Sequence, residues 1–401
     1  MNASTWERAL ELPSPKTAPD GGGRAVTARE TLSRAAPAAR AARITRVAAI
    51  GGLDRIGVPV FCAFRPASRN LAVSQGKGAD ADAARASAVM EAIELWHAER
   101  HRLPLRYSTT EALLGSGERV ADVPGLVKCP CHEYTPTRPL RWTRGFDLFA
   151  RAPAWVPYEA VHCDWRLPTP PGEHSFQNGS NGLASGNTLV EAIVHGLCEV
   201  IERDCLIAFD RLPEEVSVRR RVDPATVGDP VCLDLLERFA AAGIELAIWD
   251  MTAGIGVPTY TCVAIEVDAP WYRPLPQTQG SGTHPVRAVA LRRAITEAAQ
   301  ARAAIIGGAR DDIFPERYAY YFDAAERDRL ALETAIPAAR RFADTEEAVH
   351  DTANADLAWL LERLAAAGRR EAVVVDLTDP RFGLPVVKVI VPGLEWRPWE
   401  D

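Results

Sequence analysis

The chain has 401 residues, of which 47% are hydrophobic and 25% charged, and its formal net charge is −7. This length and composition are typical of a globular protein with one large domain or two. The acidic balance and the lack of a basic run exclude nucleic acid as the main partner. We find no signal-peptide core and no apolar run of 18 residues, so we predict a cytoplasmic protein with no membrane partner.

The first 43 residues are rich in Ala, Pro, Arg and Gly, and we predict a flexible arm there with one short helix over 28–42. Two strand-like runs follow at 44–50 and 57–64, with a turn between them. Residues 72–78, AVSQGKG, are predicted to form a loop.

A helix is predicted over residues 81–101, after that loop. Ser87, Glu91 and Glu94 lie within roughly 60° of one another on it, beside apolar neighbours. Residues 104–180 indicate short strands and Pro-rich loops with no clear chemistry. The eight cysteines are scattered, which favours reduced thiols over disulfides. Cys129, Cys131 and His132 lack the spacing of a zinc site, and we interpret them as loop residues while leaving a metal role open.

The most informative stretch is the helix predicted from about residue 187 to 210. A Gly-rich loop opens it, and Asn187 or Thr188 is the expected cap. The helix is apolar over most of its circumference, with one narrow polar stripe made of Asn187, Glu191, His195, Glu199 and Glu202. Because buried carboxylates without partners are very costly, a cation is expected there, and a divalent metal is the first candidate.

Two carboxylate pairs share one spacing, Glu91 with Glu94 and Glu199 with Glu202, each three residues apart. Such pairs on exposed helices are mildly repulsive and common. Their placement on two mostly apolar helices favours a shared site over that ordinary interpretation.

The rest of the chain predicts a helix at 230–242, strands at 245–250 and 259–267, and a third strong helix at 288–307. Residues 280–284 form a second Gly-rich segment, predicted to be a loop of backbone donors. Gly-rich loops before helices suit phosphate oxygens, and Lys77 adds a charge, although neither segment has P-loop spacing. A charged peripheral region at 315–345, a helix at 351–368 and strands at 372–376 and 386–391 complete the chain.

The third helix places Arg293, Glu297 and Gln300 on one stripe, with Arg302 about 140° from Glu297, at the edge of a site or on the surface. Carboxylates, a Gly-Lys segment, a Gln and Arg residues are what a divalent metal that bridges nucleotide phosphates requires. The sequence resembles the YcaO family of ATP-dependent enzymes over about residues 43–395. The matching segments are SQGKG (74–78), SAVMEAIE (87–94), 181–204, 284–302, GGARDD (307–312) and LPVVKVIVPGLE (384–395).

The resemblance implies a mixed α+β fold in which β-sheets pack on buried helices that hold the glutamates of an ATP site. It implies a catalytic domain over residues 44–401, with ATP and Mg²⁺ as cofactors. The metal-facing residues would be Glu91, Glu94, Glu199 and Glu202. Glu199, Glu202 and Arg203 would be catalytic. The nucleotide would contact Ser74, Lys77, Ser87, Asn187, Glu191, Arg203, Glu297, Gln300 and Arg302.

Two departures from the family pattern bear on the product. Leu95 follows Glu94 where the family usually has Arg, and the chain ends EWRPWED without the Pro-x-Pro-x-Pro tail of azoline-forming members. The ending instead looks like that of YcaO members that act with TfuA proteins and install backbone thioamides. We therefore expect thioamide formation on a precursor peptide with a TfuA-like partner, and a cyclodehydratase that forms azolines from Cys, Ser or Thr is the alternative.

Two other classes stay open. A di-iron oxidase uses two Glu-x-x-His motifs, but Cys205 stands where the second His would follow Glu202. The other class is a non-enzymatic ATP-binding scaffold. His195 is interpreted as a hydrogen-bonded pocket residue or a proton shuttle. A separate leader-peptide-binding protein is expected, and a homodimer is one open arrangement.

Overall fold

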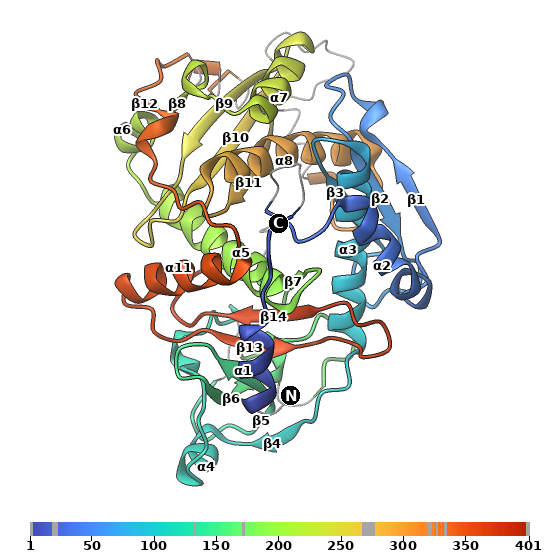
Figure 1. The fold of residues 1–401 in the computed structure, drawn as a ribbon, viewed down its shortest axis with the longest axis vertical. Coiled ribbons are helices and arrows are strands. Elements are labelled where there is room, and N and C mark those ends of the chain that lie inside the picture. The colour runs from blue at the N-terminus through green and yellow to red at the C-terminus, as the bar shows by residue number, and fades with distance from the viewer. Residues whose placement is uncertain are drawn as a thin grey trace.

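The computed structural model describes residues 3–17, 23–130, 134–170, 173–266, 277–316 and 335–397, with 318, 323, 325, 328, 329, 331 and 332 between the last two ranges. The fold is mixed α+β, as predicted (Figure 1). The larger helices are α1 (Ala3–Glu11), α2 (Ala28–Ala41), α3 (Ala81–Arg100), α5 (Leu189–Asp210), α7 (Pro230–Ala241), α8 (Arg287–Gly307) and α11 (Ala353–Ala366), and the shorter ones include α4 (Thr110–Gly115) and α6 (Glu214–Ser217).

Three main sheets surround the helices α3, α5 and α8 (Figure 1). One consists of β1 (Arg46–Ala49), β2 (Val60–Phe64) and β3 (Val73–Lys77), and a second of β9 (Glu245–Asp250), β10 (Thr259–Ile265) and β11 (Gln277–Thr283). The third has six strands: β4 (Arg106–Ser108), β5 (Leu140–Asp147), β6 (Ala152–Pro157), β7 (Leu183–Ser185), β13 (Val373–Asp376) and β14 (Val386–Ile390). A short pair, β8 (Val222–Asp223) with β12 (Arg340–Arg341), lies beside β9.

The hydrophobic core is built where each sheet meets a helix. Val190, Ile193 and Leu197 of α5 pack against Val387 and Val389 of β14 in the largest cluster. A second cluster joins α3 to the six-stranded sheet, and a third joins α7 and α8 to β9 and β10. The three central helices are therefore held on several sides by apolar contacts, which fixes the polar stripes that they present to one another.

Most predicted elements are confirmed, including the helices α3, α5, α7, α8 and α11 and the strands at either end of the chain. The three predicted Gly-rich loops are wrong, and the one that opens α5 contains strand β7. Residues 72–78 contain strand β3, and residues 280–284 belong mostly to strand β11. The reason is close packing, since a Cβ on Gly76 would lie 2.0 Å from the backbone nitrogen of Ala88, and one on Gly280 would lie 2.2 Å from that of Ala298. Glycine here lets a helix lie directly on a strand.

The N-terminal segment also differs from the predicted flexible arm. Trp6 on α1 is 4% exposed, and its ring stacks on Phe146 with centroids 5.3 Å apart. Lys16 forms an ion pair with the buried Asp356 at 2.5 Å, and α2 packs along α3. The composition of this segment indicated mobility, but one buried tryptophan and several polar contacts attach it to the domain.

None of the described helices is both long enough and apolar enough to cross a membrane. Among the described residues, six buried cysteines are free thiols, in agreement with the prediction: Cys62, Cys163, Cys198, Cys205, Cys232 and Cys262. Cys131 and His132 lie outside the described residues.

Candidate functional site

The acidic helix α5 begins as predicted. Thr188 is the N-cap residue, and its hydroxyl accepts a hydrogen bond of 3.1 Å from the backbone nitrogen of Glu191. The apolar circumference of the helix is buried in the core. Glu199 and Glu202 consequently point to the inside of the molecule, where they meet residues of α3 and α8.

Each central helix follows a strand, and a polar residue followed by glycine lies at or near the end of each of these strands. We call these three segments the strand–helix units: β3 with α3, β7 with α5, and β11 with α8. In each unit the last glycine of the strand region is preceded by a polar residue, which is Lys77 before Gly78, Ser185 before Gly186 and Ser281 before Gly282. Lys77 and Ser185 are the last residues of β3 and β7, whereas Ser281 lies inside β11.

The three polar residues that precede these glycines each contact a glutamate of another unit, in a cyclic order. Lys77 of the first unit forms an ion pair with Glu297 on the helix of the third. The backbone nitrogen of Ser185 in the second unit donates to Oε1 of Glu94 in the first at 2.8 Å, and the Ser185 hydroxyl donates to the same oxygen.

The third contact closes the cycle. The hydroxyl of Ser281 in the third unit donates to Oε1 of Glu202 in the second at 3.0 Å. Each strand thus positions a carboxylate of a neighbouring helix at the common centre.

Five carboxylates gather at this centre, on Glu91, Glu94, Glu199, Glu202 and Glu297. Burial raises the pKa of Glu94 to about 8, with further increases from the charges of Glu91 and Glu199. Burial likewise raises the pKa of Glu199 to about 7, and the neighbouring Glu202 adds to that effect. These groups hold protons near neutral pH mainly because burial disfavours their charged forms, and neighbouring carboxylates add to the effect.

Cations surround the carboxylates without neutralising all of them. Burial raises the pKa of Glu297, but Lys77, Arg203 and Arg293 outweigh it, so the pKa is lowered overall. Burial raises the pKa of Glu91, and Arg310 and Lys77 only partly offset that increase. The site therefore has separate subregions, with cations near Glu297 and an excess of carboxylates near Glu94 and Glu199.

The donor set suits a hard cation. Glu202 is only 2% exposed. Its buried Oε2 nevertheless has no hydrogen-bond partner among the described residues. Carboxylate oxygens are the ligands that Mg²⁺ prefers, and Mg²⁺ commonly uses one or two of them together with phosphate oxygens. Within the described ranges, no three His, Cys, Asp or Glu side chains converge on one point. An Mg²⁺ that shares its coordination with phosphates fits this arrangement.

The N-terminal segment contacts the first residues of the polar stripe of α5, Asn187 and Glu191. Arg24 donates to Oε1 of Glu191 at 2.9 Å, and the backbone nitrogen of Ala25 donates to Oε2 at 3.1 Å. Thr31 of α2 donates to Oδ1 of Asn187, whose amide nitrogen in turn donates to Glu191 at 3.3 Å. Glu191 and Asn187 thus connect the N-terminal segment to the site, and their predicted nucleotide contact stays a prediction.

Two predicted site residues lie elsewhere. Ser74 is on β3, but strand alternation places it on the face opposite to Lys77, where the sheet packs on α3. Arg302 is fully buried and donates to Asp54 at 2.8 Å and to Glu266, in a separate ion cluster.

Ser87 and Gln300 lie half-buried on α3 and α8, and their nucleotide contacts stay predictions.

The histidines do not support a di-iron site. Nδ1 of His97 hydrogen-bonds the carbonyl of Ile93, and its ring lies against Trp96. Burial lowers the pKa of His97, which faces Asp376 and Asp379 rather than the glutamate centre. His195 lies 3.3 Å from Arg293, and burial next to Arg24 and Arg293 lowers its pKa, so it is a neutral hydrogen-bonding group.

Several site residues were missed from the sequence. Ser185 and Ser281 gave no signal because each is one serine in a Gly-rich segment taken for a loop. Arg310 lies in the quoted GGARDD segment, donates to Asp312 at 2.8 Å and lowers the pKa of Glu91. Arg24 was hidden in the supposed arm.

Comparison with known proteins places this geometry in context. The model of the YcaO family, described as YcaO cyclodehydratase, ATP- and Mg²⁺-binding, matches residues 75–395. A curated relative, a protein in the tfuA 3′ region of Rhizobium leguminosarum bv. trifolii, is 36% identical over 93% of this chain and 88% of its own length.

Two solved structures share the fold. A heterocyclase in complex with substrate and cofactor matches with a TM-score of 0.77 and 22% identity over 97% of this chain, which spans 55% of that protein. The YcaO protein of Methanopyrus kandleri bound with AMPPCP and Mg²⁺ matches with a TM-score of 0.69 and 24% identity over 92% of both chains. The predicted cofactors, ATP and Mg²⁺, are those of the matching family.

Proposed function

The chain belongs to the YcaO family of ATP- and Mg²⁺-binding proteins, and from that premise we propose that it converts a backbone amide of a peptide to a thioamide at the expense of ATP. The observation that supports an ATP-dependent reaction is the central cluster of five carboxylates, of which Glu202 is buried and the others are half-buried, with raised pKa values for Glu94 and Glu199. Such a cluster is unfavourable alone and becomes favourable with a bound cation.

The proposed reaction balances as a single exchange. Hydrosulfide adds to the amide carbon, which forms the C–S bond and leaves a negative charge on the amide oxygen. That oxygen attacks the γ-phosphorus of ATP and releases ADP. The C–O bond then breaks, phosphate leaves with the original oxygen, and loss of the S–H proton gives the C=S bond.

The residues of this chain supply positioning and charge. Bound Mg²⁺ would neutralise charge on the phosphoryl group, and one or two of Glu94, Glu199 and Glu202 would hold it together with phosphate oxygens. Lys77 and Arg203 flank Glu297, so they form the cationic side of the site. Donors fixed before the reaction stabilise charge that develops on the phosphoryl oxygens. No nucleophilic side chain of the protein is required.

The thioamide product and the partner follow from the relative and the C-terminus. The relative in the tfuA 3′ region is similar over almost the whole chain, which supports a TfuA-like partner that delivers sulfur. The substrate would be a ribosomally made precursor peptide, with a separate leader-binding protein. The segment PVVKVIVPGLE, residues 385–395, resembles the ending of the TfuA-associated group.

The alternative is azoline formation, in which a Cys, Ser or Thr side chain is the nucleophile. The family description and the heterocyclase with the same fold favour it. The test is to incubate the enzyme with ATP, Mg²⁺, sulfide and the precursor peptide encoded nearby, and to measure the peptide mass. Exchange of oxygen for sulfur supports the proposal. Loss of one water without any need for sulfide would replace it with the alternative.

A further inference from the structure

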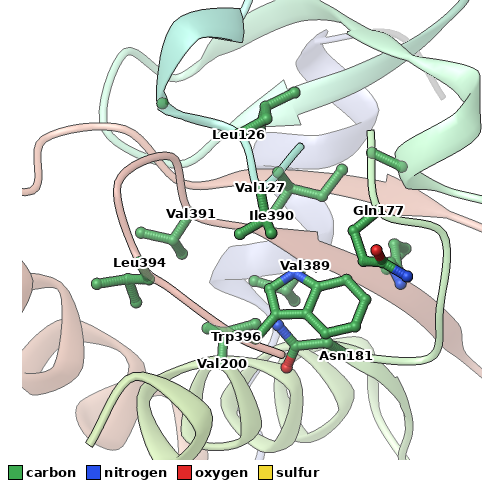
Figure 2. Close-up of a pocket in the computed structure, with 13 residues that line it drawn as sticks. Leu126, Val127, Gln177, Asn181, Val200, Val389, Ile390, Val391, Leu394 and Trp396 are labelled. Atoms are coloured by element: carbon green, nitrogen blue, oxygen red, sulfur yellow. The ribbon is translucent and has the colours of Figure 1, made fainter. Parts of the chain in front are cut away.

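A small cavity lies behind the C-terminal segment, next to the glutamate site but separate from it. Its volume is about 40 Å³, and its lining includes Gln177, Asn181, Val200, Lys388 and Trp396. Figure 2 shows Trp396 in the middle of this lining, beside Asn181 and in front of Val389. We call it the Lys388 cavity.

The walls are mostly apolar, but one cation lies among them. Lys388 is 3% exposed, and its ammonium group donates to the carbonyl oxygen of Gly179. The indole of Trp396 packs on the same glycine, since a Cβ on Gly179 would lie 2.8 Å from its ring. Trp396 and the Lys388 ammonium therefore both contact Gly179 in the wall of this cavity.

The polar groups in this cavity have unused hydrogen-bonding capacity. An ammonium group has three donors, and among the described residues the Lys388 ammonium has Gly179 as its hydrogen-bond acceptor. Oδ1 of Asn181 is buried and has no partner among the same residues, and because it is an acceptor it suits a donor such as the S–H group of a ligand. A buried ammonium without a carboxylate partner is costly, and a small anion would offset that cost.

The size of the cavity limits the ligand. A single water needs roughly 10–15 Å³ of such space. The space of about 40 Å³ therefore suits a monoatomic anion or one of similar size better than a phosphate ester. The ligand class is a small monovalent anion.

The cavity borders the glutamate site through α5. Val200 lines it, and the preceding residue, Glu199, faces the glutamate centre. Burial lowers the pKa of Lys388, and the Cys163 thiol and Glu199 oppose that shift, so the lysine and Glu199 lie within electrostatic range of each other. Lys388 therefore lies close enough to Glu199 for their charges to interact.

We propose that the Lys388 cavity binds hydrosulfide, the external sulfur nucleophile, with Lys388 as its counter-ion and Trp396 in the cavity wall. This inference rests on the proposed thioamide-forming function. A reaction with an external nucleophile needs a place to hold that nucleophile, whereas a nucleophile from the substrate side chain does not. Lys388 stabilises the anionic form, which is the form that attacks the amide carbon.

The first test is kinetic and uses Lys388→Met, which keeps most of the side-chain volume but removes the charge. The KM for sulfide should rise at least tenfold, while the KM for ATP changes less than twofold. Lys128→Met is the matched control, because Lys128 is exposed and follows Val127 of the cavity wall. A purely structural role for Lys388 would lower the melting temperature without a selective effect on sulfide, and that result would overturn the proposal.

The second test needs neither the variant nor the reaction. Crystals of the wild-type protein soaked in sodium bromide should show an anomalous peak within hydrogen-bonding distance of the Lys388 ammonium, since bromide resembles hydrosulfide in charge and size. Absence of that peak would show that the cavity holds no small anion. A bromide peak with an unchanged sulfide KM in Lys388→Met would overturn the assignment to hydrosulfide.

The two proposals fail in different ways. If the wild-type enzyme removes water from the peptide and never incorporates sulfur, the proposed function is wrong, and the hydrosulfide assignment is wrong with it. If the enzyme forms the thioamide but Lys388→Met and Trp396→Ala leave the sulfide KM unchanged, only the cavity assignment is wrong.

Discussion

The hydroxyl of Ser281 donates a 3.0 Å hydrogen bond to Oε1 of Glu202, across the interface between β11 and α5. The other carboxylate oxygen of Glu202 is buried without a partner among the described residues. One serine from a neighbouring strand therefore orients the carboxylate and leaves its second oxygen available to a cation. Ser185 has the same relationship to Glu94.

Ser281→Ala should weaken binding of Mg²⁺ with a non-hydrolysable ATP analogue by roughly tenfold, because a hydrogen bond to a charged group contributes about 1.5–3 kcal/mol. Ser185→Ala should act similarly. Calorimetric titration measures both. Ser116→Ala is the control, since that hydroxyl hydrogen-bonds the carbonyl of Leu113 on the exposed helix α4. Equal affinity in all three variants would contradict the assigned role of the two serines.

The protein without nucleotide should lose stability as pH rises through the neutral range. The pKa values of about 8 for Glu94 and about 7 for Glu199 lie above those of the unfolded chain. The folded state thus binds more protons than the unfolded state between about pH 5 and pH 8, so the free energy of unfolding falls across that window, by on the order of a few kcal/mol. Urea unfolding at several pH values measures it.

Glu94→Gln should flatten that pH dependence, because the amide cannot ionise, and should raise stability at pH 8. Glu237→Gln, on the exposed face of α7, is the control and should leave the slope unchanged. A slope that is the same in wild type and Glu94→Gln would show that Glu94 titrates normally in the folded protein.

Binding of Mg²⁺ and ATP should release protons near pH 7. A cation at the site favours the ionised carboxylates, so groups that were protonated because of burial lose their protons on binding. Titration calorimetry in buffers with different ionisation enthalpies gives the number released. Glu199→Gln should reduce both the proton release and the affinity while the protein stays folded. Binding with no dependence on buffer would place the ligand away from Glu94 and Glu199.

Lys77→Ala should raise the Kd for ATP by a factor that corresponds to about 1.5–3 kcal/mol, because its ammonium is a charged donor on the cationic side of the site. Arg203 and Arg293 remain near Glu297, so the melting temperature should change little. Lys16→Ala gives the opposite expectation, with a lower melting temperature and normal ATP affinity, since Lys16 pairs with the buried Asp356. Nucleotide affinity unchanged in Lys77→Ala would remove Lys77 from the site.

Trp6→Ala should destabilise the protein by about 3 kcal/mol, since the tryptophan is 4% exposed and stacks on Phe146. Leu12→Ala is the control because Leu12 is 65% exposed. The free energy of unfolding from urea denaturation measures both. Identical values for the two variants would restore the prediction of a flexible arm.

The sequence predicts the central helices well because their signal is local. The apolar circumference of α5 and its narrow acidic stripe are readable from 22 residues, and the cap at Thr188 is a local hydrogen bond. That burial pattern favours a shared site for the two glutamate pairs, and in the structure Glu94 lies within electrostatic range of Glu91 and Glu199, while their metal-binding role stays a prediction. The inference of a shared site did not require knowledge of how the helices pack.

The rest depends on contacts between distant segments. In a sequence, Gly76 and Gly280 indicate turns or loops. In the fold they are positions where the backbone of a helix lies directly on a strand. The sequence places Arg302 among the candidate site residues. In the fold it pairs with Asp54, 248 positions away, and with Glu266, so it belongs to a separate ion cluster. Trp6 shows the converse, because one aromatic residue in a low-complexity segment was enough to attach α1 to the core.

The cyclic contacts among the strand–helix units also constrain how the molecule matures. Each of the three contacts joins two different units: Glu297 with Lys77, Glu94 with Ser185, and Glu202 with Ser281. None of these three carboxylates therefore has its strand partner within its own unit. During synthesis the first two units leave the ribosome with an incomplete centre, and the cycle closes only when β11 and α8 have been made. A chain that ends before β11 and α8 would therefore have an incomplete centre, without the contacts that position Glu202 and Glu297.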